Sequence, residues 1–205
     1  MLDQLNGETM RWRDIVEFID FDELADLKMP GSMQRMLNDQ GYRFLARGAG
    51  GAVFDKPGSP NVVKVGKLND GWWEWINWAK SNQYDCVLKV VNVRKYNDAL
   101  YMATIEKLKP VPDSFTKTKT WLGYCAWMYL YTSDDTFKEI YLRRATDEQI
   151  KQLADDFASE QPCLPNVLKH LVDSFKHYHL DLYGVENFMF RENQLVVTDP
   201  LSRKK

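Results

Sequence analysis

The sequence predicts an α+β protein with two unlike parts, an antiparallel, mainly β part followed by a mainly helical one. Between residues 42 and 105, short apolar strands alternate with turns rich in Gly, Pro, Asn and Asp. After the two prolines that follow Lys109, apolar residues recur at helical spacing instead. We therefore expect a helical extension over residues 1–40, a β lobe over 41–109 and a reduced, mainly helical lobe over 110–205.

Composition limits the possible partners. The chain has 205 residues, 44% of them apolar, which indicates a packed globular protein. Because 27 Lys and Arg nearly balance 29 Asp and Glu, we expect neither direct nucleic-acid binding nor membrane binding. The longest apolar-rich stretch, Trp121 to Tyr131, is too short to cross a bilayer, and the N-terminal residues lack the basic start and apolar block of a signal peptide, so we expect none. Cys86, Cys125 and Cys163 are odd in number and far apart, which favours reduced, mostly buried thiols in a cytoplasmic protein.

The extension and the β part have distinct patterns. Residues 1–40 are acidic and place Ile15, Phe18 and Ile19 on one helical face before a break at Pro30-Gly31, so we interpret them as an accessory cap. Strands are expected within YRFLARGAGGAVFDKPGSPNVVKV, then over 86–93 and, after a turn, over 99–105. Between them, NDGWWEWINWAKSN places apolar residues at helical spacing after a cap at Asn69 or Asp70. The tryptophans of this helix are most simply core, the alternative being a partner surface.

The helical part ends in a hairpin. Thr146 and Gln149 form a capping box before one amphipathic helix, and a second apolar stripe from Leu168 to Tyr178 runs into HLDLYGVENFM, residues 179–189. Two short strands then flank the turn RENQ and end at Asp199.

The first motif with candidate chemistry is ARGAGGAVF, from Ala46 to Phe54. Gly48, Gly50 and Gly51 lack a Cβ, so backbone N–H groups at this turn can approach phosphate oxygens. A flexible hairpin is the alternative, since glycine-rich turns are common.

The second motif is Lys64, in the apolar strand VVKV. A buried ammonium group needs an anion, because an unpaired buried charge is costly. A nucleotide phosphate together with a helix carboxylate, for which Glu74 is the best candidate, would supply it. An ordinary structural ion pair is the alternative.

The third motif joins residues 179–189 to LVVTDPL. We expect Asp181, Asn187 and Asp199 to converge, with one carboxylate to accept a hydroxyl proton and an amide and a carboxylate to hold Mg²⁺ between phosphates. His179 is expected to brace the loop rather than to act as a base.

The order of these parts resembles the eukaryotic-like protein kinase fold, so the class we expect is a truncated two-lobe kinase-like fold. The resemblance implies that Asp181 and Lys64 are catalytic and that Asn187 and Asp199 bind Mg²⁺. It also implies an ATP site, with TIEKLKP as the hinge. The implied ATP-binding residues are Gly48, Gly50, Gly51, Val53, Lys64, Glu74 and Glu106.

Two segments narrow the resemblance. PNVVKVGK and NFMF…VVTDPLS look like the early serine/threonine protein kinases of T7-like podoviruses, over roughly residues 42–109 and 165–202. This resemblance implies phosphorylation of host proteins in the host bacterial cytoplasm and a part in shutting off host transcription. It also makes Ser202 a candidate for autophosphorylation.

The sequence departs from the kinase pattern in several places. Five residues separate Asp181 from Asn187, one more than usual, and we expect Gly184 to let the extra residue bulge outward. Tyr183 replaces a phosphate-facing lysine, and Pro200-Leu201 replace Phe-Gly, so no flip of this segment is expected. The six residues after Asp199 hold no activation segment, so a protein substrate is expected to dock on the N-terminal helices or on a partner subunit.

Three functions therefore compete. The first is an active phage serine/threonine kinase that uses ATP and Mg²⁺. The second is a pseudokinase that binds and inhibits a host protein without chemistry. The third is a small-molecule phosphotransferase of the aminoglycoside-kinase type, which shares an H-x-D loop but normally has a larger helical lobe for its acceptor. The oligomeric state stays open.

Overall fold

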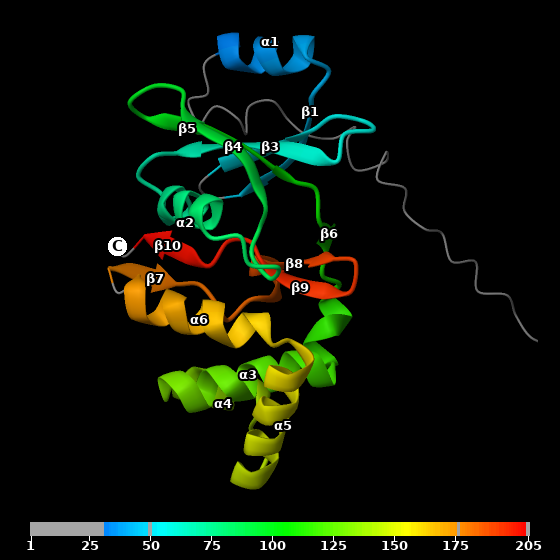
Figure 1. The fold of residues 1–205 in the computed structure, drawn as a ribbon, viewed down its shortest axis with the longest axis vertical. Coiled ribbons are helices and arrows are strands. Elements are labelled where there is room, and N and C mark those ends of the chain that lie inside the picture. Colours follow the sequence, from blue (N-terminus) through cyan, green and yellow to red (C-terminus); the bar gives the residue numbers. More distant parts are fainter. Residues whose placement is uncertain (1–30, 49–50, 176, 204–205) are drawn as a thin grey trace, which may run out of the picture.

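The computed structural model describes residues 31–48, 51–175 and 177–203, which form a β lobe and a mainly helical lobe along one long axis (Figure 1). The α+β class and the division into a β lobe and a mainly helical lobe are those that the sequence predicts. The helices are α1 (Gly31–Asp39), α2 (Gly71–Ser81), α3 (Lys119–Thr132), α4 (Asp135–Tyr141), α5 (Asp147–Glu160) and α6 (Cys163–Ser174), with 3₁₀ turns η3 (Asp113–Lys117) and η4 (Val185–Asn187). The strands are β1 (Arg43–Gly48), β2 (Gly51–Asp55), β3 (Asn61–Lys67), β4 (Val90–Lys95), β5 (Leu100–Glu106), β6 (Lys109–Pro110), β7 (Tyr178–Leu180), β8 (Phe188–Arg191), β9 (Gln194–Val197) and β10 (Leu201–Arg203).

The β lobe is a five-stranded antiparallel sheet in the order β1-β2-β3-β5-β4. Side chains alternate between its faces along β3. Val63 and Val65 face α1 and pack with Met33 and Leu37, whereas Lys64 lies on the opposite face, toward α2 and the rest of the molecule. The side chain of Lys64, in the middle of β3, therefore points toward the helical lobe.

The start of the chain departs from the predicted division. The helix face carrying Ile15, Phe18 and Ile19 lies outside the described residues. The break at Pro30-Gly31 is followed by α1, which packs on the sheet through Met33 and Leu37. Part of the expected extension is thus integral to the β lobe.

The predicted strand over 86–93 is wrong in its first half. Residues 86–88 precede β4 and are buried against the helical lobe instead of joining the sheet, whereas the exposed Lys89 bonds to Glu106 at the end of β5. The Val197 N–H donates to the Cys86 carbonyl at 3.0 Å, and Val87 bridges Val197 in parallel. The apolar run is buried because it seals the junction between lobes, which periodicity does not distinguish from a strand.

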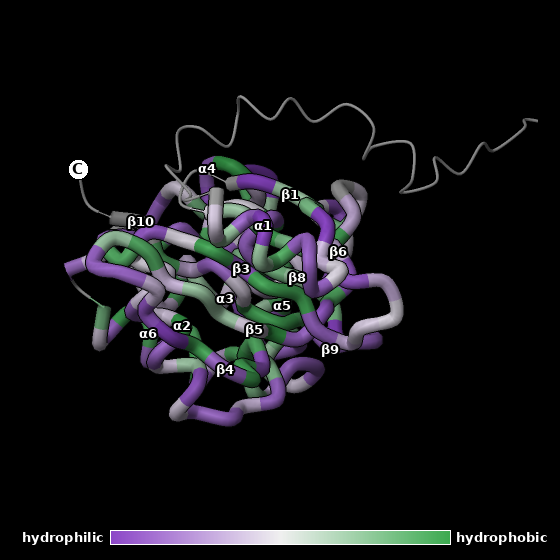
Figure 2. Tube along the Cα trace, turned by 90° about the horizontal axis from the view of Figure 1, so that it is seen from above, coloured by the Kyte–Doolittle hydropathy of each residue, from purple (hydrophilic) through white to green (hydrophobic). Residues whose placement is uncertain are grey.

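The helical lobe confirms the capping box of Thr146 and Gln149 at the start of α5 and the hairpin of β8 and β9. The helix α5 packs closely on α3, because Gly123 has no Cβ and one there would lie 2.7 Å from the Leu153 carbonyl. Hydrophobic segments gather in the middle of the molecule, with hydrophilic ones mostly around them (Figure 2). No helix among the described residues has both the length and the apolar character needed to cross a bilayer.

The cysteines correct the sequence prediction. Cys86 and Cys163 form a disulfide with a Cα–Cα distance of 5.8 Å, and only Cys125, which is buried, is a free thiol. Their separation of 77 residues made pairing look improbable, but the fold brings the loop before β4 against the first turn of α6. Whether two cysteines can form a disulfide depends on the distance between them in the folded protein, which their separation in the sequence does not reveal.

Candidate active site

Lys64 and Asp199 meet at the junction between the lobes. The Lys64 Nζ lies 3.1 Å from the Asp199 Oδ2, across 135 positions in the sequence. The lysine side chain is 13% exposed and the carboxylate 43%, so the cation is the more buried partner. The same ammonium lies 4.0 Å above the ring centroid of Trp72, in a cation–π contact. The sequence requirement that Lys64 find an anion is therefore met by Asp199.

Two tryptophans of α2 hold the peptide immediately before Asp199. The Trp72 and Trp75 indole N–H groups both donate to the Thr198 carbonyl, at 3.0 and 3.1 Å. Both rings are buried, with at most 1% exposed. A buried carbonyl with two donors is fixed in orientation, because moving it would leave both indoles unsatisfied. The tryptophan-rich helix is thus core, and it also sets the position of the Asp199 backbone.

Asp181, Asn187 and Asp199 do converge, through a network of backbone hydrogen bonds. The Asp181 N–H donates to the Pro200 carbonyl at 2.9 Å, and the Asn187 Nδ2 donates to the Asp181 carbonyl at 2.7 Å. The Asn187 carbonyl accepts from the Thr198 N–H at 2.9 Å, the Thr198 Oγ1 at 3.0 Å and the Asp199 N–H at 3.4 Å. The two parts of the third motif are therefore held together as one unit.

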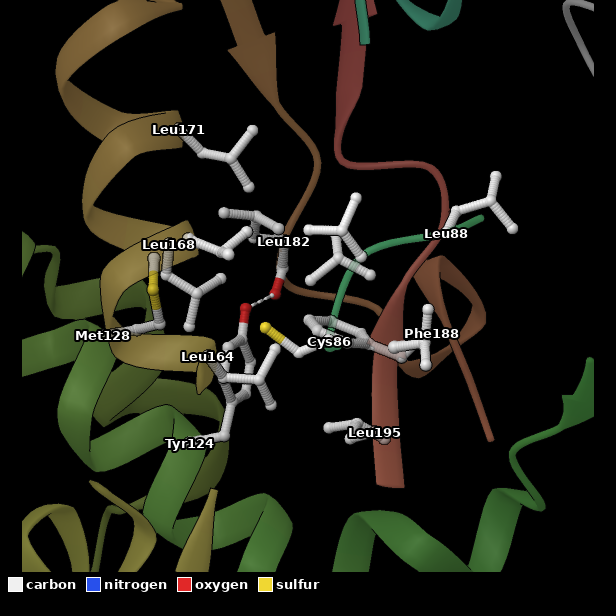
Figure 3. Packing of buried hydrophobic residues seen from close by; sticks show 14 of the residues in the cluster. Cys86, Leu88, Tyr124, Met128, Leu164, Leu168, Leu171, Leu182, Phe188 and Leu195 are labelled. Carbon is white, nitrogen blue, oxygen red and sulfur yellow. Dashed lines mark hydrogen bonds between the residues drawn. The ribbon is translucent and has the colours of Figure 1, made fainter. Parts of the chain in front are cut away.

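The extra residue between Asp181 and Asn187 is accommodated in the 3₁₀ turn η4. Gly184 precedes this turn with φ −97° and ψ 138°, which any L-residue adopts, so the expected need for glycine is wrong. Leu182 is buried, and its carbonyl accepts from the Tyr124 hydroxyl at 2.6 Å in the apolar core beneath the loop (Figure 3). The loop is anchored from below by α3.

Tyr183, which replaces the expected lysine, is turned toward the helical lobe. Its hydroxyl donates to Asp134, its carbonyl accepts from the Tyr141 hydroxyl at 2.8 Å, and its ring lies 4.7 Å from that of Phe137. Burial and the Asp134 hydrogen bond raise the pKa of Tyr183 to about 12. The side chain braces the loop and carries no charge at neutral pH.

The glycine-rich hairpin is present as β1 and β2. Gly48 pairs with Gly51, and Gly50 lies outside the described residues. Gly51 is required by its surroundings, because a Cβ there would overlap the Val65 carbonyl of the neighbouring strand. Val53 pairs directly with Lys64, so the two lie side by side on the same face of the sheet. The register is compatible with the predicted ATP contacts of this hairpin.

The two predicted glutamates take other positions. Glu74 is exposed on α2, whose buried face is formed by Trp72, Trp75 and neighbouring apolar residues, so the expected pairing of Glu74 with Lys64 is replaced by the Asp199 pair. The Glu106 carboxylate accepts from the Arg191 Nε at 2.9 Å and the Lys89 N–H at 2.6 Å. Its side chain therefore ties the end of β5 to β8.

Sequence reasoning treated Asp70 only as a possible helix cap and did not select Tyr101. Asp70 is the N-cap residue of α2. Burial and the Asp199 carboxylate raise the pKa of Asp70, while Lys64 lowers it. Tyr101 is fully buried and stacks on Trp72. The helical periodicity of α2 was the available sequence signal. It places Trp72, close to the cap residue Asp70, on the buried face of the helix and Glu74 outside that face.

The backbone of Ser202 lies in β10, paired with His179 in β7. The side chains of both residues lie outside what the structure describes.

Asn187 and Asp199 offer oxygen atoms of the kind that a magnesium ion takes as ligands. The amide nitrogen of Asn187 is used in the bond to Asp181, which leaves the amide oxygen as the atom that can act as a ligand. Asp199 offers a carboxylate that is partly exposed. Within the described ranges, no group of three or more His, Cys, Asp and Glu side chains is arranged around a metal position. Mg²⁺ commonly takes one or two protein oxygens together with phosphates and water, so a small ligand set suits it.

Comparisons with known proteins give limited information. No protein-family model and no curated protein matches the chain. It is similar to the crystal structure of a thermostable mutant of aminoglycoside phosphotransferase APH(4)-Ia in a ternary complex with ADP and hygromycin B, with 12% identity and a TM-score of 0.41 over 84% of this chain and 73% of that one. For the crystal structure of APH(4)-Ia, the identity is 12% and the TM-score 0.40, over 83% and 71% of the two chains. Likeness of this degree does not identify a substrate, so function is argued from the site itself.

Proposed function

We propose that this chain transfers the γ-phosphoryl group of ATP in a Mg²⁺-dependent reaction, as an early serine/threonine protein kinase of a bacteriophage acting on host proteins in the bacterial cytoplasm. One observation carries the proposal. Lys64 of the β lobe contacts Asp199, and the backbone around Asp199 is bonded to Asn187 and next to Asp181. A cation for phosphates, two metal-binding oxygens and a carboxylate for the acceptor are the parts that phosphoryl transfer requires.

Each residue has a role that follows from its position. Lys64, held on the rigid β3 beside Val53, binds the α- and β-phosphates. Asn187 and Asp199 hold Mg²⁺, which would neutralise charge on the phosphates when bound. Asp181 orients the acceptor hydroxyl and accepts its proton, since its main chain is fixed by Pro200 and Asn187 while its side chain is only partly buried.

A second candidate, transfer to a small molecule, is favoured by one specific observation. The residues after Asp199 form β10, which pairs with β7 from Leu201 to Arg203. This part of the described chain is therefore occupied in a strand ladder and does not offer a peptide-docking segment. A hydroxylated small molecule would need no such segment.

The test is transfer from labelled ATP with Mg²⁺ to the protein itself, to a bacterial lysate and to a panel of aminoglycosides. We expect labelled protein on serine and threonine, and a loss of about 100-fold or more in Asp181→Ala and Lys64→Ala. Asp155→Ala, on the exposed surface of α5, and Lys80→Ala, at the exposed end of α2, are the matched controls.

The outcomes separate the candidates. Label on an aminoglycoside alone supports the small-molecule reaction. No transfer to any acceptor, together with full host-protein binding by Asp181→Ala, supports the pseudokinase and overturns the enzyme proposal.

A further inference from the structure

The side chain of Trp72 contacts both of the groups that the proposed reaction brings together. The Lys64 Nζ lies 4.0 Å from the centroid of its ring. Its indole N–H donates to the Thr198 carbonyl at 3.0 Å, directly before Asp199. Because the Lys64 Nζ also lies 3.1 Å from the Asp199 Oδ2, the ring, the cation and the carboxylate form one cluster. One residue of α2 thus joins the lysine of the β lobe to the segment that carries Asp199.

The orientation of the Trp72 ring is fixed by its surroundings. The ring is 1% exposed and stacks on Tyr101, with the two centroids 5.5 Å apart and the planes 10° from parallel. Tyr101 in turn lies against Gly66 of the neighbouring strand, where a Cβ would overlap with the Tyr101 hydroxyl. A large ring held by a stack, a hydrogen bond and close packing has little freedom to turn. Lys64 therefore meets a fixed aromatic surface.

The Trp72 ring is the contact of Lys64 that a bound metal does not remove. Asp199 is 43% exposed, and a carboxylate that becomes a ligand of Mg²⁺ gives up much of its attraction for a neighbouring ammonium. An aromatic ring keeps its attraction for the ammonium, because Mg²⁺ takes oxygen ligands. Glu74, the helix carboxylate that the kinase pattern predicts as the partner of Lys64, is exposed and lies outside the buried face of α2.

We propose that Trp72 is a positioning residue, whose ring holds the Lys64 ammonium in place for the phosphates while Asp199 binds Mg²⁺. This inference rests on the proposed function and gives Trp72 the role that the sequence assigned to Glu74. Its indole N–H holds the backbone before Asp199 at the same time, so one side chain sets the spacing between the cation and the metal ligand. A lysine held in advance avoids the cost of ordering a flexible side chain on binding, which corresponds to roughly two- to tenfold in affinity.

The first measurement follows the Lys64 side chain by NMR in the wild-type protein with isotope-labelled lysine, without ligand and with saturating Mg-ADP. Protons above an indole ring resonate upfield, because the ring current shields them. We expect an upfield signal from the ε-methylene group of Lys64 in both states, assigned by its absence from Lys64→Arg. A signal that moves to the ordinary lysine position when Mg-ADP binds would overturn the inference.

The second measurement compares Mg-ADP affinity by calorimetry in matched variants. Trp72→Leu and Trp75→Leu each remove a buried indole and one donor to the Thr198 carbonyl. The ring beneath the Lys64 ammonium is lost in the first of them. We expect Trp72→Leu to bind Mg-ADP roughly two- to tenfold more weakly than Trp75→Leu. Trp72→Phe keeps a ring face for the ammonium, so we expect it to match Trp75→Phe, which loses the other donor.

The outcomes distinguish the inference from the proposed function. Equal affinities in the two leucine variants would show that the Trp72 ring acts only through packing and would overturn the inference alone. If Trp72→Leu does not fold, the NMR measurement on the wild type decides between the same two outcomes. A wild-type protein that binds no Mg-ADP would overturn the proposed function and the inference with it.

Discussion

Loss of the Cys86–Cys163 disulfide should lower the stability of the protein substantially. The bond joins the loop before β4 to the start of α6, and closes a loop of 77 residues. Chain entropy alone gives about 4.5 kcal/mol at 25 °C for a closed loop of this length, and measured losses for native disulfides are typically about 2–5 kcal/mol. At about 2–4 °C per kcal/mol for a chain of this size, the Tm should fall by roughly 10 °C.

The assay is thermal unfolding followed by circular dichroism, with and without a phosphine reductant. Cys163→Ser should show the lower Tm in both conditions, because it has no bond left to reduce. Cys125→Ala, which removes the buried free thiol, should keep the full response to reductant. Thiol titration in denaturant provides the independent count, and one free thiol per unreduced chain is expected.

Two results would refute this reasoning. Three free thiols in the unreduced protein would show that the bond does not form under those conditions. One free thiol with a reductant shift below about 2 °C would show that the two segments stay together without the bond, so that loop closure contributes little to stability.

Further predictions concern the loop and its surroundings. Gly184→Ala should keep phosphotransfer and a Tm within about 2 °C of the wild type, because the atoms nearest to the added Cβ belong to the movable carboxylate of Glu186. A large loss would show that glycine is needed at this position. Tyr183→Phe should flatten the alkaline fall in stability between pH 10 and about 12, because the folded-state pKa of Tyr183 is raised and its proton is lost more easily on unfolding; an unchanged pH profile in urea denaturation would contradict this. Ser202→Ala should remove self-phosphorylation seen by mass spectrometry while transfer to other acceptors continues, and a phosphate mapped elsewhere would exclude this site.

Much of the fold could be predicted because its signals are local. The capping box at Thr146, the turn between β8 and β9 and the helix with four tryptophans each depend on neighbouring residues. The junction at residues 86–88 could not be predicted in the same way. It is buried in a core cluster that includes Val197, more than a hundred positions away, and its apolar run looks like any strand.

The sequence predicts which residues belong to the site, but not which of these residues contact each other. A buried Lys64 requires an anionic partner. The kinase pattern predicts Glu74 in this role, because Glu74 matches the position of the helix glutamate in that pattern. The helix phase contradicts this choice, since residues 72, 75, 76 and 79 form the buried face and position 74 falls outside it. The anion of Lys64 instead comes from Asp199, on a segment 135 positions away, which helix phase alone does not predict.

The contacts around Asp199 explain why a motif with a lengthened loop still assembles. The acidic side chain is positioned mainly through its backbone neighbours, by the two indoles on Thr198 and the three donors on the Asn187 carbonyl. Such contacts do not depend on the Phe-Gly that usually follows the aspartate, or on the length of the loop that ends at Asn187. They depend on α2 staying against the segment around Thr198, to which Trp72 and Trp75 donate. The positions of Asn187 and Asp199, the proposed metal ligands, therefore depend on the junction between the lobes, and substitutions in the tryptophans should disturb them more than substitutions within the loop.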